Sequence, residues 1–292
     1  MNSLRRSRWW RCEMPCSRLA YVGACLVFSF LATIGHAEDG EIKRVLLLGQ
    51  SPDDHPPGTH EYLPGMKILA RCLQNVPGLK VDVIRADGAW TDGPELIREA
   101  DCVVLFLAEG AKWIHEDPRR LEAFAQLAAR GGGLIALHWG MGTRDARYIA
   151  GFLRLFGGCH GGPDRKYKVL ESQLQVVDSD HDIVRGIDPL MLREEFYYQL
   201  KLVDAERVQP ILQTTIDGKD ETVAWAWQRA DGGRAFGFSG GHLHSNWSHI
   251  EYRRLMSQAV LWALKVPVPK EGLPVQVSTE DLALPNSPRN SQ

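Results

Sequence analysis

The stretch that most constrains the fold is residues 132–142, Gly-Gly-Leu-Ile-Ala-Leu-His-Trp-Gly-Met-Gly. A continuous apolar run after a glycine turn is typical of a parallel strand that is buried on both faces. This strand would deliver His138 into a tight turn before a helix that begins near Asp145. Ligands bind at the carboxyl ends of strands in open α/β sheets. The alternative interpretation is a core strand whose histidine only caps the turn.

Strands alternate with helices through the first half of the chain. Further apolar runs predict strands at 42–49, 80–85 and 101–107, and amphipathic patterns predict helices at 63–76, 91–99 and 117–130. This order indicates a three-layer α/β fold with a parallel, flavodoxin-like sheet. Alternating patterns then predict mainly antiparallel strands that extend or flank the sheet, at 168–177, 198–203, 209–215, 222–228 and 234–239, before a closing helix at 251–265.

The N-terminus has the composition of a leader. Five arginines precede the apolar run 19–34, and small residues follow at 35–37. This pattern predicts a secretory signal peptide over residues 1–37 and an exported protein, periplasmic or extracellular. If the segment is not cleaved, it would be an anchor and the only contact with a membrane. The remaining chain divides into a domain at 38–266 and a proline-rich tail at 267–292, which we expect to be poorly ordered or to wrap around the domain.

Charge and cysteine content exclude several classes. A net charge of −2 and a pI near 6.6 provide no electrostatic basis for binding nucleic acid. Outside the leader only Cys72, Cys102 and Cys159 remain, which is not a disulfide framework. Nine tryptophans offer flat apolar faces for stacking on a saccharide or for core packing. A homo-oligomer remains open.

Histidines recur where the predicted strands end. If those strands share a direction, their polar ends converge on one edge of the sheet. Imidazoles with a carboxylate are ligands for zinc or another divalent metal, and the same groups could serve acid-base catalysis. No compact His-Glu-x-x-His spacing is present. The converging set is His55, His60, Glu109, His138, His242 and His244, and the candidate metal ligands are His55, His60, His138 and His242.

Two further segments supply candidate pocket residues. Residues 157–162 form a glycine-rich loop around Cys159 and His160, in which His160 either lines a pocket or has a plain loop role. Glu195 precedes Tyr197, and an acid with a phenol suits sugar hydroxyls or general-base work, although a charged edge before core aromatics explains the pattern equally. Neither a P-loop nor a dinucleotide fingerprint is present, so nucleotide binding is disfavoured.

Several ordered segments together resemble the ThuA-like (trehalose utilisation) proteins over about residues 42–265. They are Gly-Gly-Gly-Leu-Ile-Ala-Leu-His at 131–138, Leu-Phe-Gly-Gly-Cys-His at 155–160, His-Asp-Ile-Val-Arg-Gly-Ile at 181–187, Glu-Glu-Phe-Tyr at 194–197, Val-Ala-Trp at 223–225, and Gly-Arg-Ala-Phe at 233–236 with Gly-His at 241–242. The resemblance implies a class I glutamine amidotransferase-like fold and a role in carbohydrate metabolism.

The resemblance does not extend to glutamine amidotransferase activity. True amidotransferases carry a Gly-x-Cys-x-Gly nucleophile turn, whereas residues 136–140 read Ala-Leu-His-Trp-Gly. Without the thiol, hydrolysis of glutamine through a thioester is not expected, and similarity of fold does not restore it.

The leading hypothesis is an exported ThuA-like protein that acts on a saccharide or keto-sugar by acid-base or metal-assisted chemistry, as a hydrolase or an isomerase. A non-catalytic sugar-binding or accessory module is the alternative. The candidate catalytic residues are His138, His242 and Glu195, and the candidate substrate-binding residues are His60, Trp139, His160, Tyr197 and His244.

Overall fold

A computed structural model describes residues 42–204 and 207–285. The predicted signal peptide at 1–37 lies outside the described residues. None of the described helices combines the length and apolar character needed to cross a bilayer.

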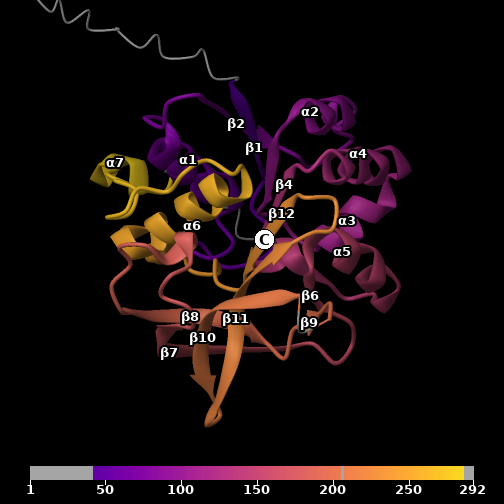
Figure 1. The fold of residues 1–292 in the computed structure, drawn as a ribbon. Coiled ribbons are helices and arrows are strands. Elements are labelled where there is room, and N and C mark those ends of the chain that lie inside the picture. The colour runs from indigo at the N-terminus through magenta and orange to yellow at the C-terminus, as the bar shows by residue number, and fades with distance from the viewer. Residues whose placement is uncertain (1–41, 205–206, 286–292) are drawn as a thin grey trace, which may run out of the picture. The chain divides into compact units, whose positions relative to one another are not determined.

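Nine strands form one sheet, in the order β2-β1-β3-β4-β12-β11-β10-β7-β8 (Figure 1). The first five are parallel and have the flavodoxin-like order, which confirms the predicted fold class. Their bounds are β1 (Lys43–Gly49), β2 (Leu79–Arg85), β3 (Cys102–Leu105), β4 (Gly133–Leu137) and β12 (Arg234–Phe238).

Helices cover both faces of the parallel strands, and alternate strand residues enter two separate apolar cores. Leu47 and Ile135 pack in the core beneath α1 and α6, whereas Leu46 and Leu134 pack in the core beneath the other helices. Figure 1 shows α1 and α6 on the opposite side of the sheet from α2, α4 and α5. The helices are α1 (Tyr62–Leu73), α2 (Gly93–Glu99), α3 (Gly110–Glu116), α4 (Pro118–Ala129), α5 (Ile149–Phe156), α6 (Ile250–Ala263) and α7 (Thr279–Leu282).

The remaining four strands are antiparallel and follow β12, which is parallel to β4 on one side and antiparallel to β11 on the other. In Figure 1 β7, β8 and β10 lie together below the parallel strands. A small second sheet joins β5, β6 and β9. The bounds are β5 (Gly142–Thr143), β6 (Gly158–Gly161), β7 (Lys166–Val176), β8 (Leu190–Tyr198), β9 (Lys201–Leu202), β10 (Val208–Ile216) and β11 (Lys219–Gln228).

One predicted strand was wrong. Residues 198–203 were expected to form a strand, but the strand at this point is β8, which ends at Tyr198, and only the two-residue β9 follows. The charges of 193–195 obscured the alternation of β8, in which Leu190, Leu192 and Phe196 are buried. Glu194 belongs to the same buried face, so a charged side chain stands where the pattern calls for an apolar one.

Residues 267–285 pack against α6. Val268, Leu273 and Val275 are buried in the core beneath α1 and α6. The side chain of Gln258 accepts a hydrogen bond from the Leu273 amide (2.7 Å), and Arg253 donates to the carbonyl of Val275 (3.0 Å). This part of the proline-rich segment therefore wraps around the domain. Four single-turn 3₁₀ helices complete the described structure: η1 (His138–Met141), η2 (Ala146–Tyr148), η3 (Asp182–Val184) and η4 (His244–Ser248).

Candidate functional site

Three histidines meet at the carboxyl ends of the parallel strands. His60 lies in the loop after β1, His138 directly follows β4, and His242 follows β12. The amide of His60 donates to the carbonyl of His242 (3.0 Å), which joins two of these loops. The ring centroids of His60 lie 4.9 Å from His138 and 4.8 Å from His242. The structure thus brings together side chains that are up to 182 residues apart, at the edge where α/β sheets bind ligands.

The backbone at this edge is strained. His60, Glu109 and His138 have φ values of 52°, 47° and 47°, in the left-handed region that side chains with a Cβ rarely adopt. Such conformations cost on the order of 1–3 kcal/mol each and cluster at functional sites. Gly241 packs closely against His138 at this edge. A Cβ at position 241 would lie 2.9 Å from the Cβ of His138, which is too close for a side chain.

Hydrogen bonds determine which nitrogen of each ring carries the proton. The Nδ1 of His60 donates to Oδ2 of Asp53 (2.9 Å), and the hydroxyl of Tyr62 donates to the same oxygen (2.7 Å). The Nδ1 of His138 donates to the carbonyl oxygen of Ser239 (2.7 Å). Carboxylate and carbonyl oxygens only accept, so in the neutral rings both Nε2 atoms keep a lone pair.

These two lone pairs face each other. The Nε2 atoms of His60 and His138 lie 3.0 Å apart, and the hydroxyl of Tyr197 also lies 3.0 Å from the Nε2 of His138. A proton between the rings would require one of them to be charged. Burial, and then the charge of a neighbouring histidine, holds the pKa of His138 well below its usual range, and burial also lowers the pKa of His60. The hydroxyl of Tyr197 can donate to the lone pair of His138, and a metal cation is another group that the two facing lone pairs can bind together.

Glu195 and His242 complete a four-residue cluster with these rings. Oε1 of Glu195 lies 3.8 Å from Nε2 of His138 and 3.9 Å from Nδ1 of His242. That Nδ1 atom is buried and has no hydrogen-bond partner among the described residues. Burial lowers the pKa of His242 to about 4, so its ring is neutral and free to act as a ligand. One ligand atom from each of His60, His138, Glu195 and His242 lies within 4.8 Å of every other, and we call these four residues the histidine end of the site.

Asp53 and His55 support the histidine end from behind. Oδ1 of Asp53 lies 2.8 Å from Nδ1 of His55, whose ring lies against that of His60 at a centroid distance of 3.7 Å and a tilt of 33°. Although burial opposes it, hydrogen bonds from His60 and Tyr62 hold the pKa of Asp53 below its usual range. His55, a candidate ligand from the sequence, therefore lies beside Asp53 and outside the four-residue cluster.

Glu194 shapes the loop that carries His242. Its buried carboxylate accepts hydrogen bonds from the amides of Gly241 (2.9 Å), His242 (3.1 Å) and Leu243 (3.3 Å). It also accepts from its neighbour's amide (2.8 Å) and from Nδ2 of Asn246 (2.9 Å). Burial raises the pKa of Glu194 to about 7, and these five donors act in the opposite direction. Only a carboxylate can satisfy all five.

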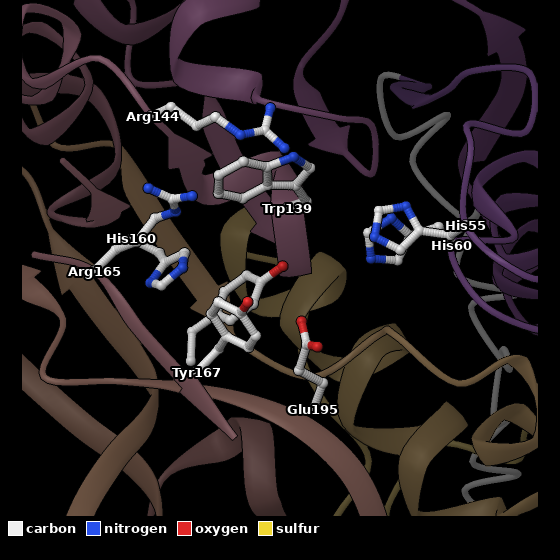
Figure 2. Close-up of a pocket in the computed structure, with 9 residues that line it drawn as sticks. His55, His60, Trp139, Arg144, His160, Arg165, Tyr167 and Glu195 are labelled. Atoms are coloured by element: carbon white, nitrogen blue, oxygen red, sulfur yellow. The ribbon is translucent and has the colours of Figure 1, made fainter. Parts of the chain in front are cut away.

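A cavity of about 130 Å³ opens beside the histidine end (Figure 2). Roughly 10–15 Å³ suffices for one water molecule, so the cavity has room for a small ligand. Tyr197 stacks between the rings of His138 (4.4 Å) and His160 (3.8 Å). Burial, and then the charges of Arg165 and Lys201, lowers the pKa of His160 to about 3. The cavity is lined by His55, His60, Trp139, Arg144, His160, Arg165, Tyr167, Glu195 and Tyr197.

The structure separates one candidate from the others. His244 belongs neither to the cavity lining nor to the four-residue cluster, and its Nε2 donates to the carbonyl of Leu282 (3.0 Å) in α7. Conversely, the sequence did not single out Asp53, Arg144 or Arg165, and of the paired carboxylates Glu194 and Glu195 only Glu195 was chosen as a site residue. The available signals were weak: Asp53 lies in a loop with two histidines, and Glu194 interrupts an apolar alternation.

The described cysteines are far from nucleophilic. Cys72, Cys102 and Cys159 are free and buried. Burial raises the pKa of Cys72 to about 11 and that of Cys159 to about 12, and it also raises the pKa of Cys102. The turn after β4, where amidotransferases place their thiol, carries His138 in this chain.

Solved structures with a similar fold include proteins of different descriptions. A ThuA-like protein from Bacteroides uniformis is 13% identical and superposes with a TM-score of 0.59, covering 79% of this chain and 94% of its own. A GH42 β-galactosidase from G. stearothermophilus is 11% identical, with a TM-score of 0.50, and the match covers 77% of this chain and 30% of that one. At these identities the likeness shows the fold alone.

One sequence comparison identifies the family of the chain. A search of curated proteins finds no match. The family model described as trehalose utilisation matches residues 51–263, which include the whole histidine end and all residues that line the cavity. The chain therefore belongs to the ThuA-like family, whose description indicates carbohydrate metabolism.

Proposed function

We propose that the protein is a metal-dependent enzyme of carbohydrate metabolism, in which the histidine end binds a divalent cation such as Zn²⁺. The observation that carries this proposal is the 3.0 Å separation of the His60 and His138 Nε2 atoms, both of which lack a hydrogen in the neutral rings. The unpartnered Nδ1 of His242 adds a third nitrogen. Metal-bound histidines commonly donate their second N–H to a carboxylate or a carbonyl, as His60 and His138 do.

The cavity is where a saccharide or keto-sugar would bind. A bound cation polarises a carbonyl or lowers the pKa of a water molecule, which suits hydrolysis or isomerisation of a sugar. Burial raises the pKa of Glu195. If the metal coordinates only one of its two oxygens, Glu195 can exchange a proton with a sugar hydroxyl through the other. The indole of Trp139 offers an apolar face for the sugar ring. Glutamine hydrolysis is not part of the proposal, since His138 replaces the thiol.

Metal analysis of the purified full chain tests the proposal. The protein is prepared without chelator, and its metal content is compared with that of H138A, H242A and the control H249A, which removes an exposed histidine at the start of α6. We expect near-stoichiometric metal in the wild type and in H249A, and loss of metal in the other two variants. A metal-free wild type, or equal metal in all four proteins, would overturn the metal site.

Turnover separates an enzyme from a binding module. A panel of disaccharides and their keto derivatives is incubated with the metal-loaded protein, and H138A is expected to abolish conversion while sugar affinity is largely kept. Loss of affinity alone, without conversion by the wild type, would support a non-catalytic sugar-binding module instead. The proposed export is tested by fractionating the expressing cells and measuring the mass of the exported chain, which should lack residues 1–37.

A further inference from the structure

The end of the cavity away from the histidines carries two arginines. Arg144 and Arg165 place their guanidinium carbons 5.4 Å and 5.8 Å from the centre of the Trp139 ring. In Figure 2 both lie on the opposite side of the cavity from His55 and His60. We call Arg144, Arg165 and the neighbouring neutral His160 the arginine end of the site. The cavity thus has two chemically distinct ends.

No described carboxylate balances the charge of Arg165. Its side chain is half-buried and donates to the carbonyl of Gly162 (3.1 Å), and it forms no ion pair with any described residue. The neighbouring cations differ, since Arg144 pairs with Glu109 and Lys201 pairs with Asp164. Burial is the main cause of the lowered pKa of His160, and the positive charges of Arg165 and Lys201 lower it further.

We infer that the saccharide carries an anionic group, which Arg165 binds with help from the free donors of Arg144. A guanidinium presents a planar fork of donors that matches a carboxylate, sulfate or phosphate. A neutral ligand would remove water from Arg165 without returning any charge, which disfavours its binding. This inference rests on the proposed binding of a saccharide in the cavity, and it narrows that ligand to acidic sugars and their esters.

A stack of three rings, His138, Tyr197 and His160, runs from one end of the site to the other. Tyr197 lies between His138 at the histidine end and His160 at the arginine end. Two stacking steps thus separate the ends, a span that one sugar unit with its substituent covers. Tyr167, which is 58% exposed at the start of β7, borders the same space. An anion bound at Arg165 would therefore orient the ring so that its far side meets the histidines.

Calorimetric titration tests the inference. The purified full chain is titrated with D-glucuronate, D-glucose 6-phosphate and neutral D-glucose. The same titrations are made with R165Q and with the control R147Q, since Arg147 is exposed, pairs with Asp145 and does not line the cavity. We expect at least one anionic sugar to bind about 10- to 100-fold more tightly than glucose, as one charge-assisted contact predicts. R165Q should abolish this preference and R147Q should keep it, and the preferred probe distinguishes a carboxylate from a phosphate ester.

Three results would overturn the inference. They are equal or tighter binding of glucose by the wild type, no binding of either anionic sugar, and an anion preference that R165Q retains because the anion binds a metal instead. Metal content measured on the same samples distinguishes this failure from failure of the proposed function. Metal without an anion preference leaves the metal site standing, whereas an Arg165-dependent preference without metal supports the anionic ligand alone.

Discussion

The parallel and antiparallel halves of the sheet supply different chemistry to one site. The parallel half contributes nitrogen, because His60, His138 and His242 follow β1, β4 and β12. The antiparallel half contributes oxygen and positive charge. Glu195 and Tyr197 lie on β8, and Arg165 directly precedes β7. Neither half alone holds a complete ligand set or a complete cavity.

The two halves reach the site by different routes. Parallel strands end at the same edge, so any polar residue that follows them arrives there. The strand β8 is at the other end of the nine-strand order from β2, and four strands separate it from β4. Its carboxylate nonetheless lies 3.8 Å from His138. β7 pairs with β10 through Val176 and Gln175, and Figure 1 shows β7 and β8 lying across β10. The comparison teaches that the histidines are placed by chain direction and the oxygens by the direction in which the β7–β8 pair leaves the sheet.

The largest expected effect comes from replacing Glu194, whose carboxylate connects β8 in the antiparallel half to the loop after β12 in the parallel half. In E194Q an amide NH₂ replaces one oxygen and faces N–H donors such as that of Gly241. We expect the free energy of unfolding to fall by about 2–4 kcal/mol, since buried donors lose their acceptor. Urea denaturation measures this change. The control E195Q should shift it by less than about 1 kcal/mol, and equal stability of the two variants would contradict the proposed role of Glu194.

A smaller effect is expected at Asp53, a residue of the parallel half that contacts a proposed ligand without being one. Its substitution distinguishes support of a ligand from direct binding of the metal. In D53N the His60 ring loses its carboxylate partner while every proposed ligand remains. We expect metal affinity to fall about 10- to 100-fold, as for other supporting residues of metal sites. Competition with a chromogenic chelator measures it. D54N, at the exposed neighbouring position, should match the wild type, and an unchanged affinity in D53N would show that Asp53 does not support the site.

The smallest effect, counted per pH unit, concerns His160, whose pKa is lowered by burial and then by the charges of Arg165 and Lys201. Its pKa is about 3 in the folded protein and near 6.5 ordinarily, so below pH 6.5 the unfolded chain binds more protons at this ring. Stability should therefore be complete above pH 6.5 and fall towards pH 3 by up to about 1.4 kcal/mol per pH unit from this group. Chemical denaturation of the metal-free protein at about pH 6.5, 5.5 and 4.5 measures how the free energy of unfolding changes with pH.

The variants isolate the contribution of His160. H160N should flatten the slope, whereas H249A, which removes an exposed histidine, should leave it unchanged. An H160N slope as steep as that of the wild type would mean that His160 is protonated in the folded protein.

Much of the parallel half could be predicted from the sequence. Continuous apolar runs ending in glycine or histidine define β1, β3 and β4 locally, because strands buried on both faces need no alternation. The positions of His60, His138 and His242 at strand ends follow from the same runs. The helix α3 was not predicted, although α2 is equally short, because α2 has a proline in its first turn and α3 has neither such a proline nor a capping side chain.

The antiparallel half shows what local pattern cannot decide. The alternation in β7 was visible, but its pairing with β8 was not, because the partner was obscured by the charges at 193–195. Likewise, His242 and His244 look equivalent in the sequence, yet His242 belongs to the four-residue cluster and His244 contacts Leu282. Side-chain direction in an irregular loop depends on contacts with distant segments.

The sequence by itself therefore determined the order of strands and helices, the edge at which polar residues gather, and the nitrogen-rich character of that edge. These properties depend on the periodicity of neighbouring residues and on the shared direction of parallel strands. Only the tertiary structure decided which oxygens join the histidines, which ring nitrogens carry hydrogens, and where Arg165 lies. Those outcomes depend on the pairing of β7 with β8 and β10 and on buried hydrogen bonds between residues far apart in the chain.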